Sequence, residues 1–269
     1  MKFLYEGKAK IVYEVDKDKC LIYFKDSATA FDATKKATIE GKGIINNTIS
    51  SLLFKLLEEK GISTHFIEKV SEREMLVWKA KRYDLEVVVR NITAGSLCKR
   101  LGLREGERLK KPLVELFYKK DELHDPLICI DHALLLGIAD KKSILKMIDM
   151  AKRVNKVLKK FFKDHGLLLV DFKLEFGLLP DGSLAVIDEI SPDTCRLWDA
   201  KTGEKLDKDR FRFDVDKVWV KMVDPDSAVV IESDDTERDP YLCVVMPMRL
   251  LAEAFYWLRP LLFSLLAFW

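Results

Sequence analysis

The segment that decides the fold spans residues 167–190 and reads LLLVDFKLEFGLLPDGSLAVIDEI. Its two apolar runs, residues 167–176 and 184–190, have the length and composition of strands. The residues between them, 180–183, are Pro-Asp-Gly-Ser, and each of these residue types favours a turn. The segment therefore predicts a β-hairpin.

Charged side chains share one face of this hairpin, because side chains alternate along a strand. If the turn has two residues, Glu175 faces Asp188 at about 4.5–5.5 Å, and like charges so placed repel unless something compensates. Magnesium would compensate, since it binds through carboxylates and substrate phosphates. The alternative is two solvated acids on an exposed face. Lys173 shares the face of Glu175, and either neutralises the carboxylates or meets an anionic substrate.

Outward from the hairpin, the pattern predicts an α+β fold. An apolar stripe of helical period runs from Ser143, which can cap the helix, to Gly166, and another runs from Gly43 to Gly61. Short strand-like runs fill residues 3–24 as a β-meander. Strands before and between helices, without regular βαβ alternation, are typical of α+β domains.

The strand turn at residues 6–10, Glu-Gly-Lys-Ala-Lys, is a candidate phosphate site. Glycine permits close backbone approach to a phosphate, and the ammonium groups of Lys8 and Lys10 oppose its charge. This is not the Walker pattern, which the chain lacks, so a basic surface turn remains the alternative.

Two further loops carry arginine. Arg90 ends an apolar strand and is followed by Gly95-Ser96; a planar guanidinium with backbone and hydroxyl donors suits phosphate or carboxylate recognition. A strand-to-helix turn with an incidental arginine is the alternative. The second loop runs from Ser191 to Arg196 directly after Asp188-Glu189, so its polar groups are expected to converge on the metal.

Composition limits the function classes. Lys and Arg number 46 against 44 Asp and Glu, giving a net charge of +2, which disfavours nucleic-acid binding. The five cysteines are scattered and predict neither a zinc site nor a disulfide framework. Reduced thiols, and a charged first stretch without the apolar core of a signal peptide, lead us to expect a cytoplasmic protein.

These segments together resemble the SAICAR synthetase family over about residues 4–221. The two runs of the hairpin region are similar to its signature segments, the turn at residues 6–10 to its nucleotide loop, and the Arg90 region to its ribotide loop. The matching segments are residues 5–10, 30–32, 42–47, 89–102, 170–177, 188–193 and 196–199.

The resemblance implies a two-lobed fold with ATP between an N-terminal antiparallel β lobe and a larger α+β lobe. It also implies an ATP-dependent ligase of purine biosynthesis, which joins the carboxylate of the aminoimidazole ribotide CAIR to the amine of L-aspartate and releases ADP and phosphate. The expected domains are residues 1–82 for the nucleotide, 83–222 for substrate and metal, and 223–269 as an atypical apolar tail.

The resemblance further assigns site residues. ATP phosphates would meet Lys8, Ala9 and Lys10, and magnesium would be held by Glu175 and Asp188. The ribotide would be bound by Arg90, Ser96 and Arg196, with Lys173, Asp193 and Arg196 as catalytic residues. Asp32 and Asn46 are the expected aspartate-binding residues. A homodimer is possible, and the expected partners are otherwise small molecules.

The tail departs from the family. Residues 222–240 are acidic and residues 241–269 strongly apolar, but Arg249, Glu253 and Arg259 interrupt the apolar run. No uncharged stretch reaches the roughly 18–20 residues of a membrane span, so we expect no membrane crossing. An interfacial anchor, a packing helix and a change of reading frame are the alternatives, and the last is favoured.

Three rival functions follow from the same residues. A phosphotransferase acting on a hydroxyl would also use lysines and a carboxylate-bound metal, but the kinase signatures are missing. A non-catalytic nucleotide-binding module would not need Arg90, Lys173 and Arg196 to converge. A membrane-associated protein is suggested by the tail alone.

Overall fold

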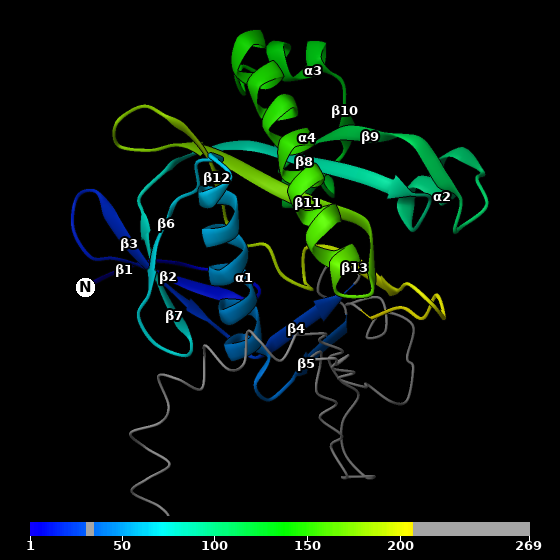
Figure 1. Ribbon diagram of the computed structural model, residues 1–269. Coiled ribbons are helices and arrows are strands. Elements are labelled where there is room, and N and C mark those ends of the chain that lie inside the picture. The colour runs from blue at the N-terminus through cyan, green and yellow to red at the C-terminus, as the bar shows by residue number, and fades with distance from the viewer. Residues whose placement is uncertain (31–34, 207–269) are drawn as a thin grey trace, which may run out of the picture.

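The computed structural model describes residues 1–30 and 35–206, which form two antiparallel sheets, a two-stranded ribbon and the helices that cover them (Figure 1). The predicted α+β class is confirmed. Asp32 and the tail at residues 223–269 lie outside the described residues. In the part of the chain that is described, no helix is both long and apolar enough to cross a membrane.

The first sheet holds the N-terminal meander. Its strand order is β1-β2-β3-β7-β6, with β1 at Lys2–Glu6, β2 at Lys10–Glu14, β3 at Lys19–Phe24, β6 at Phe66–Lys69 and β7 at Glu74–Trp78. One face packs on helix α1, Lys42–Glu59, where Leu53, Phe54 and Leu57 are fully buried. The ribbon of β4, Ser27–Ala30, and β5, Lys35–Thr38, leads from this sheet to α1.

The second sheet contains the hairpin and has six strands. They are β8 (Lys81–Ile92), β9 (Arg108–Tyr118), β10 (Leu127–Ile128), β11 (Leu167–Leu178), β12 (Leu184–Ile187) and β13 (Cys195–Asp199). The order is β10-β9-β8-β11-β12, and β13 also pairs with β11. Short helical segments join these strands: α2 (Ser96–Leu101), a 3-10 turn (Asp121–Leu123) and α3 (Ile130–Leu135).

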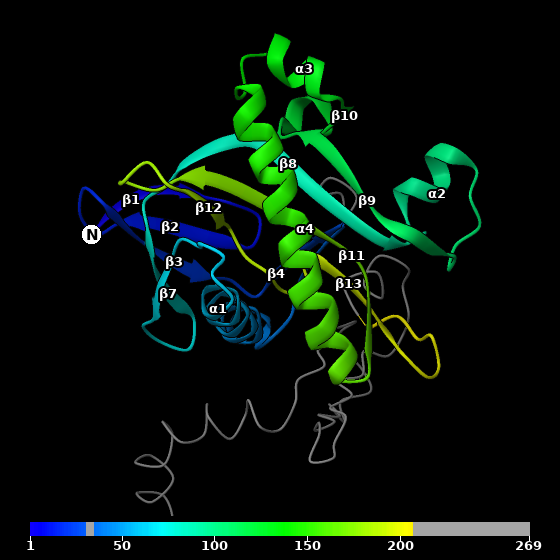
Figure 2. The same ribbon diagram turned by 45° about the horizontal axis from the view of Figure 1, so that its top comes forward.

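Helix α4, Lys141–Asp164, covers one face of this sheet and lies across β8 and β11 (Figures 1 and 2). Its apolar stripe packs on Phe172, Leu174 and Phe176 of β11. The intervening side chains of β11 point to the opposite face, so alternation gives one strand an apolar side for the core and a charged side for a site.

The capping of α4 differs from the sequence expectation. The N-cap is Asp140, whose carboxylate accepts a hydrogen bond from the Ser143 backbone N–H at 3.0 Å. Ser143 was predicted as the cap but lies inside the first turn. Both residues are good caps, and spacing alone does not separate them.

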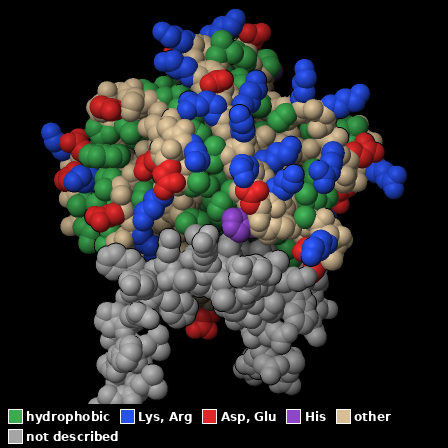
Figure 3. Space-filling model, viewed as in Figure 1, with side chains coloured by type: hydrophobic (Ala, Val, Ile, Leu, Met, Phe, Trp, Pro, Cys, Tyr) green, Lys and Arg blue, Asp and Glu red, His purple; other side chains and the backbone are tan. Residues whose placement is uncertain are grey.

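Most exposed side chains of α4 are cationic, although Leu145, Asp149 and Asp164 are exposed as well, and lysines and arginines gather over this helix in the space-filling view (Figure 3). Within the described residues, Lys160 pairs with Asp164, and Arg153 donates to the Gly61 carbonyl. The exposed cations of this face are Lys141, Lys142, Lys146, Lys152, Arg153, Lys156, Lys159, Lys160 and Lys163.

The hairpin register corrects the sequence prediction. The turn has three residues, 180–182, because the Leu179 N–H donates to the Ser183 carbonyl and Gly182 adopts a φ of 80°. A type I turn followed by a left-handed glycine is the usual three-residue hairpin loop. Glu175 therefore pairs with Ile187 on β12, not with Asp188.

The two sheets share one continuous hydrophobic core that includes Phe24, Phe54 and Phe172. The chain passes from the first sheet to the second between Trp78 and Lys81, close to the predicted boundary at residue 82. The division into residues 1–82, 83–222 and 223–269 as domains stays a prediction.

Candidate active site

The charged face of β11 borders a cavity of about 980 Å³. The β1–β2 turn with Lys8, Ala9 and Lys10 lines one side of it, and residues Lys173 and Glu175 line another. The segment after β12 contributes Asp188, Glu189 and Asp193. Parts of the chain far apart in sequence thus meet at one concave surface.

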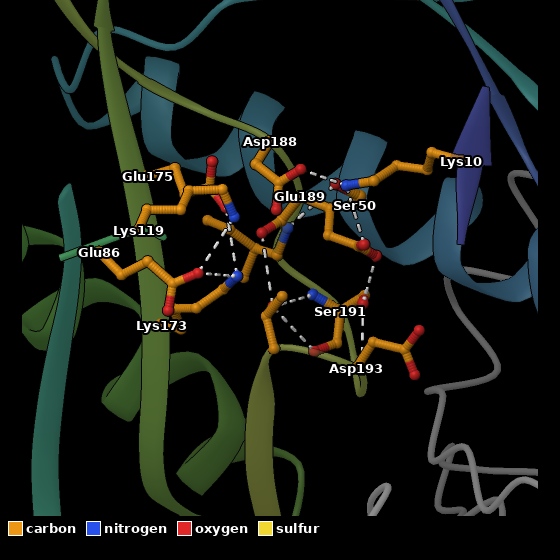
Figure 4. A network of polar contacts seen from close by, with 12 residues as sticks. Lys10, Ser50, Glu86, Lys119, Lys173, Glu175, Asp188, Glu189, Ser191 and Asp193 are labelled. Carbon is orange, nitrogen blue, oxygen red and sulfur yellow. Dashed lines mark hydrogen bonds and ion pairs between the residues drawn. The ribbon is translucent and has the colours of Figure 1, made fainter. Parts of the chain in front are cut away.

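Acids and lysines alternate around the cavity as one network, which we call the lysine cluster (Figure 4). The acids are more numerous than the lysines, and each lysine contacts two carboxylates. Its members are Lys10, Lys119 and Lys173 with Glu86, Glu175, Asp188 and Glu189.

The first half of the lysine cluster is centred on Lys10. Its ammonium group pairs with Asp188 and lies 2.9 Å from Glu189, whose other oxygen accepts from the Ser191 hydroxyl at 2.6 Å. Burial opposes the charge on Lys10, but the two carboxylates outweigh burial and raise the pKa of Lys10. Lys10 therefore stays charged and presents its ammonium group beside the cavity.

The second half contains the like-charge pair that the sequence predicted, with a different partner. Glu175 lies opposite Glu86 of β8. Lys173 lies 2.8 Å from Glu86 and 3.2 Å from Glu175, and Lys119 lies 2.8 Å from Glu175. Burial alone would raise the pKa of Glu86, but Lys173 and Lys119 lower it. Two lysines thus stabilise two buried carboxylates that would otherwise repel.

Asp188 reaches the cavity through an unusual backbone conformation. β12 ends at Ile187, and Asp188 has a φ of 73°, a left-handed value that is uncommon for a residue with a Cβ. Burial raises its pKa, but the charges of Lys10 and Lys173 outweigh burial and lower it. Asp188 is therefore ionised and lines the same cavity as Glu175, although the two are not cross-strand partners.

The carboxylates Glu175 and Asp188 fit a hard divalent cation, because such ions prefer oxygen ligands and are commonly held by one or two carboxylates plus phosphates. Among residues 1–30 and 35–206, no group of three or more His, Cys, Asp or Glu side chains is arranged as a metal site. Two carboxylates leave coordination positions that water molecules or substrate phosphates can fill.

An apolar cavity of about 520 Å³ adjoins the charged one. Val12, Ile22, Val77 and Ile187 line it, while Lys10, Glu175 and Asp188 line both cavities. A molecule with a flat apolar part and an anionic part can therefore occupy the two cavities together.

A third cavity, of about 230 Å³, lies farther along β11 and is bordered by arginines. Arg90 is 3 % exposed; its Nε donates to Glu115 at 2.5 Å and its Nη1 to Asp171 at 2.6 Å. Arg196 donates to the same Asp171 at 2.9 Å. We call Arg90, Arg100, Arg196, Ser96, Glu115 and Asp171 the arginine cluster.

Glycine 95 makes room for this arrangement. Its φ is 55°, and a Cβ there would lie 2.6 Å from an Arg196 guanidinium nitrogen. Arg196 can therefore lie flat against the backbone that precedes α2, and any larger residue would displace it.

Residues 191–196 connect the two clusters. Asp193 borders both the 980 Å³ and the 230 Å³ cavities, and Lys173 does so as well. Lys42, 1 % exposed at the start of α1, pairs with Asp193. A molecule in one cavity is thus within reach of a molecule in the other.

Known proteins resemble this chain over most of its length. Residues 3–225 match the SAICAR synthetase family. The chain belongs to the SAICAR synthetase family. A phosphoribosylaminoimidazole-succinocarboxamide synthase of Persephonella marina is 60 % identical over 213 residues, 79 % of this chain and 89 % of that protein.

Solved structures of SAICAR synthetases share the fold. One, in complex with ADP, is 56 % identical with a TM-score of 0.76 and covers 78 % of this chain and 90 % of its own. Another, from Pyrococcus horikoshii, is 54 % identical with a TM-score of 0.75 and covers 78 % and 92 %. Family membership, the predicted fold and the enzyme class are therefore confirmed.

For this SAICAR synthetase family member, the residues predicted from the sequence fall into two groups. Those lining the large cavity are Lys8, Ala9, Lys10, Lys173, Glu175, Asp188 and Asp193. Those lining the small cavity are Arg90, Ser96, Lys173, Asp193 and Arg196. Asn46, predicted for aspartate, is 1 % exposed on the buried side of α1 and lines none of the three cavities. Asp32 lies outside the described residues.

Several charged residues of the site were missed, including Glu86, Lys119, Lys42, Arg100, Glu115 and Asp171. Glu86 had a usable signal, because it is the one charged residue in the apolar run at residues 85–89. Lys42 lies in the segment at residues 42–47 that resembles the family, but it was given no role. Lys119 had no signal, since it reaches Glu175 only through a contact distant in sequence.

Proposed function

We propose that this chain condenses the carboxylate of CAIR with the amine of L-aspartate at the expense of ATP, in de novo purine biosynthesis. The observation that carries the proposal is the pair of charged cavities sharing Lys173 and Asp193, in a chain of the SAICAR synthetase family. One cavity suits a nucleotide triphosphate, and the other suits an anionic ribotide.

ATP is proposed to span the apolar cavity and the large charged cavity. The adenine ring fits between Val12, Val77 and Ile187, and the phosphates extend toward the turn that holds Lys8, Ala9 and Lys10. The relative solved with ADP supports nucleotide binding in this fold. The buried ammonium group of Lys10 would oppose phosphate charge where water does not screen it.

Glu175 and Asp188 are the proposed magnesium ligands. Both carboxyl groups lie at the border of the two nucleotide cavities, and their present lysine partners can be replaced by a cation of higher charge. When bound, magnesium supplies charge neutralisation for the transferring phosphoryl oxygens.

The ribotide is proposed to bind at the arginine cluster. Arg196 is partly exposed there, and Arg90 Nη2 donates to the Ser96 hydroxyl at 3.2 Å. A guanidinium group and a hydroxyl therefore border the same small cavity. A planar guanidinium matches a carboxylate or phosphate through two parallel hydrogen bonds. Asp32 and Asn46 remain the proposed aspartate-binding residues.

The chemistry that fits is activation of the ribotide carboxylate as an acyl phosphate. A carboxylate resists attack by an amine, and transfer of the γ-phosphoryl group converts one carboxylate oxygen into a good leaving group. Lys173, which borders both cavities, and Arg196 would stabilise the oxyanion formed when the aspartate amine attacks. Asp193, held by Lys42, is the third proposed catalytic residue at this border.

Substrate omission tests the function. ADP release should require both CAIR and L-aspartate for full turnover, and the product should be an amide. Formation of a phosphate ester instead would identify a phosphotransferase, and ATP turnover indifferent to both substrates would reject the proposal.

Isotope transfer tests the mechanism. CAIR labelled with ¹⁸O in its carboxylate should deliver one label to the released inorganic phosphate. Label retained wholly in the amide, or lost to water, would reject an acyl phosphate.

We also propose that the chain works in the cytoplasm, where its cysteines stay reduced, and that it forms a homodimer. Among the described residues, Cys20, Cys98 and Cys129 are free thiols. Light scattering after gel filtration tests the dimer, and a monomer mass at micromolar concentration would reject it.

A further inference from the structure

The core-facing side of β11 changes parity along the strand. Odd-numbered residues face the hydrophobic core at the start of the strand, and even-numbered residues face it afterwards. They are Leu167 and Leu169 before the change, and Phe172, Leu174 and Phe176 after it. A regular strand keeps one parity, because its side chains alternate. One extra residue is therefore inserted between Leu169 and Phe172.

The extra residue is Val170, at a β-bulge. Leu169 pairs with Leu197 of β13 and Asp171 pairs with Arg196, the neighbour of Leu197, so Val170 has no partner of its own on that strand. A bulge changes the direction of the side chains that follow it. Without the bulge, Asp171 and the charged residues beyond it would face the hydrophobic core, and neither cluster would form.

Two buried asparagines meet at this bulge. Asn91 of β8 is 6 % exposed, and Asn155 of α4 is 3 % exposed. Asn91 Nδ2 donates to Asn155 Oδ1 at 2.8 Å and to the Leu169 carbonyl at 3.2 Å, and Asn155 Nδ2 donates back to Asn91 Oδ1 at 3.0 Å. Because a carbonyl only accepts, the Asn91 atom that faces Leu169 is the amide nitrogen, and this fixes the direction of both bonds between the asparagines.

Packing alone does not explain asparagines at these positions. The other buried residues of α4, a helix described along its whole length, are apolar. Two leucines would fill a similar space, and they would avoid the free-energy cost of taking two amides out of water. A hydrogen bond adds what an apolar contact lacks, which is a fixed direction toward one backbone carbonyl.

The bulge adjoins the arginine cluster. Asp171, the first residue after Val170, pairs with Arg90 across β11 and β8. The Asp171 carboxylate accepts from Arg90 Nη1 at 2.6 Å and from Arg196 Nη1 at 2.9 Å. Asn91 directly follows Arg90 in the chain. A change in the bulge would therefore displace a carboxylate that both arginines contact.

We propose that Asn91 is a positioning residue for the ribotide site. Its amide, oriented by Asn155, holds the Leu169 carbonyl and thereby keeps the bulge at Val170. The bulge in turn directs Asp171 toward the two arginines. This inference rests on the proposed function, in which the arginine cluster binds the ribotide. Neither asparagine lines any of the three cavities described above, so both act through the backbone of β11.

Two leucine variants separate stability from position. Asn155→Leu removes one partner of Asn91 but keeps the bond from Asn91 to the Leu169 carbonyl. Asn91→Leu/Asn155→Leu removes that bond and leaves no unpaired side-chain amide. Met147→Ala, at a buried position of the same helix, is the control for a loss of packing without loss of a hydrogen bond. The measurements are kcat/KM for CAIR, KM for ATP and the melting temperature of each chain.

The order of stability and the order of activity should be opposite. Asn155→Leu should melt below the double variant, because a buried amide without its partner destabilises more than an apolar pair does. It should nevertheless keep kcat/KM for CAIR within about threefold of the parent, whereas the double variant should lose about tenfold. The KM for ATP should change by no more than about twofold in both variants. Met147→Ala should melt lower than the parent with the parent kcat/KM for CAIR.

The proposal is overturned if the double variant keeps the parent kcat/KM for CAIR, or if activity follows the melting temperature across the variants. It is also overturned if a crystal structure of the double variant shows Val170 still in the bulge and Asp171 still in contact with Arg90. Asn91→Ala, which removes the same bond without enlarging a side chain, takes its place if the double variant does not fold. If the parent chain does not use CAIR, the proposed function is wrong, and the crystal structure decides whether Asn91 holds the bulge.

Discussion

The lysine cluster and the arginine cluster lie on the same face of β11, four residues apart at Glu175 and Asp171, yet they are built differently. Lys173 and Lys119 contact their carboxylates as compact single charges on flexible stems. Arg90 joins Glu115, Asp171 and Ser96 through separate nitrogens of one rigid plane.

The difference matters for what each cluster can do. An ammonium group can turn away and leave a carboxylate to another cation, whereas a buried guanidinium that serves three partners cannot move without breaking all three contacts. The lysine cluster is therefore suited to charges that come and go during turnover. The arginine cluster is suited to a fixed shape that recognises a substrate.

The largest effect should come from removing a carboxylate of the lysine cluster. Glu175→Gln and Asp188→Asn should each lower kcat by on the order of 10²–10³, because the phosphoryl oxygens lose their cation. The fold should persist, since Lys173 keeps Glu86 and Lys10 keeps Glu189. Steady-state kinetics at limiting and saturating magnesium provide the measurement.

The matched control is Glu122→Gln, an acid that is 78 % exposed at its side chain and pairs only with Lys120 among the described residues. It should keep the parent kcat. Near-normal activity of both cluster variants at limiting magnesium would contradict the proposed metal site. It would also contradict the proposed role of the lysine cluster in turnover.

A smaller and more selective effect is expected at the arginine cluster. Arg90→Lys keeps the charge but loses the planar donors that orient Ser96 and Asp171, so kcat/KM for the ribotide should fall by roughly 10–100-fold. The KM for ATP should change by no more than about twofold. Arg153→Lys, on the exposed side of α4, is the control.

Equal losses for ATP, ribotide and aspartate in Arg90→Lys would show a general packing defect. In that case the proposed contrast between an adaptable cluster and a fixed recognition cluster would be lost.

The pH dependence of stability should reveal the buried His65 beside the lysine cluster. The pKa of His65 is about 3 in the folded chain against an ordinary value of 6.5, so below about pH 6.5 the unfolded chain binds the extra proton and stability is lost as pH falls. At pH 5 the loss from this group is about 2 kcal/mol relative to neutral pH. His65→Phe should lack that part of the acid sensitivity.

Urea unfolding of the parent and His65→Phe at pH 7.5 and pH 5 makes the measurement, and the difference between the two pH values is the quantity compared. An identical loss of stability in both chains would contradict a neutral buried histidine at this position.

The smallest effect is expected far from both clusters. Lys160 and Asp164 form an exposed pair one helical turn apart on α4, and exposed pairs of this kind contribute little. Lys160→Gln should leave kcat and the melting temperature unchanged within error. A clear loss of activity would mean that surface charge, not the geometry of the two clusters, controls turnover.

The sequence predicted the helices and strands of this site better than the register between its strands. The hairpin at residues 167–190, the helix after Gly43 and the long helix before His165 follow from local periodicity and are all present. The hairpin register was wrong by one residue, because proline and glycine at 180 and 182 are compatible with loops of two lengths. A shift of one residue changes every cross-strand partner.

The like-charge pair shows what local patterns cannot reach. Repulsion around Glu175 was anticipated, but the opposing acid is Glu86 of β8, about ninety positions away in sequence. Strand order in a sheet depends on how the whole chain packs, and so does the approach of Lys42 to Asp193. Contacts of this kind cannot be predicted from a local sequence pattern. By contrast, Lys173 and Asp193, which border both cavities, lie in recognisable motifs.

The cationic side of α4 has a practical consequence. The net charge of the chain is only +2, yet the cations of α4 lie together on the face of the second sheet opposite the charged side of β11. A support that carries sulfonate groups would hold the protein by this helix at low ionic strength and release it as salt shortens the screening length. A molecule held by α4 has its cavities turned toward the solution.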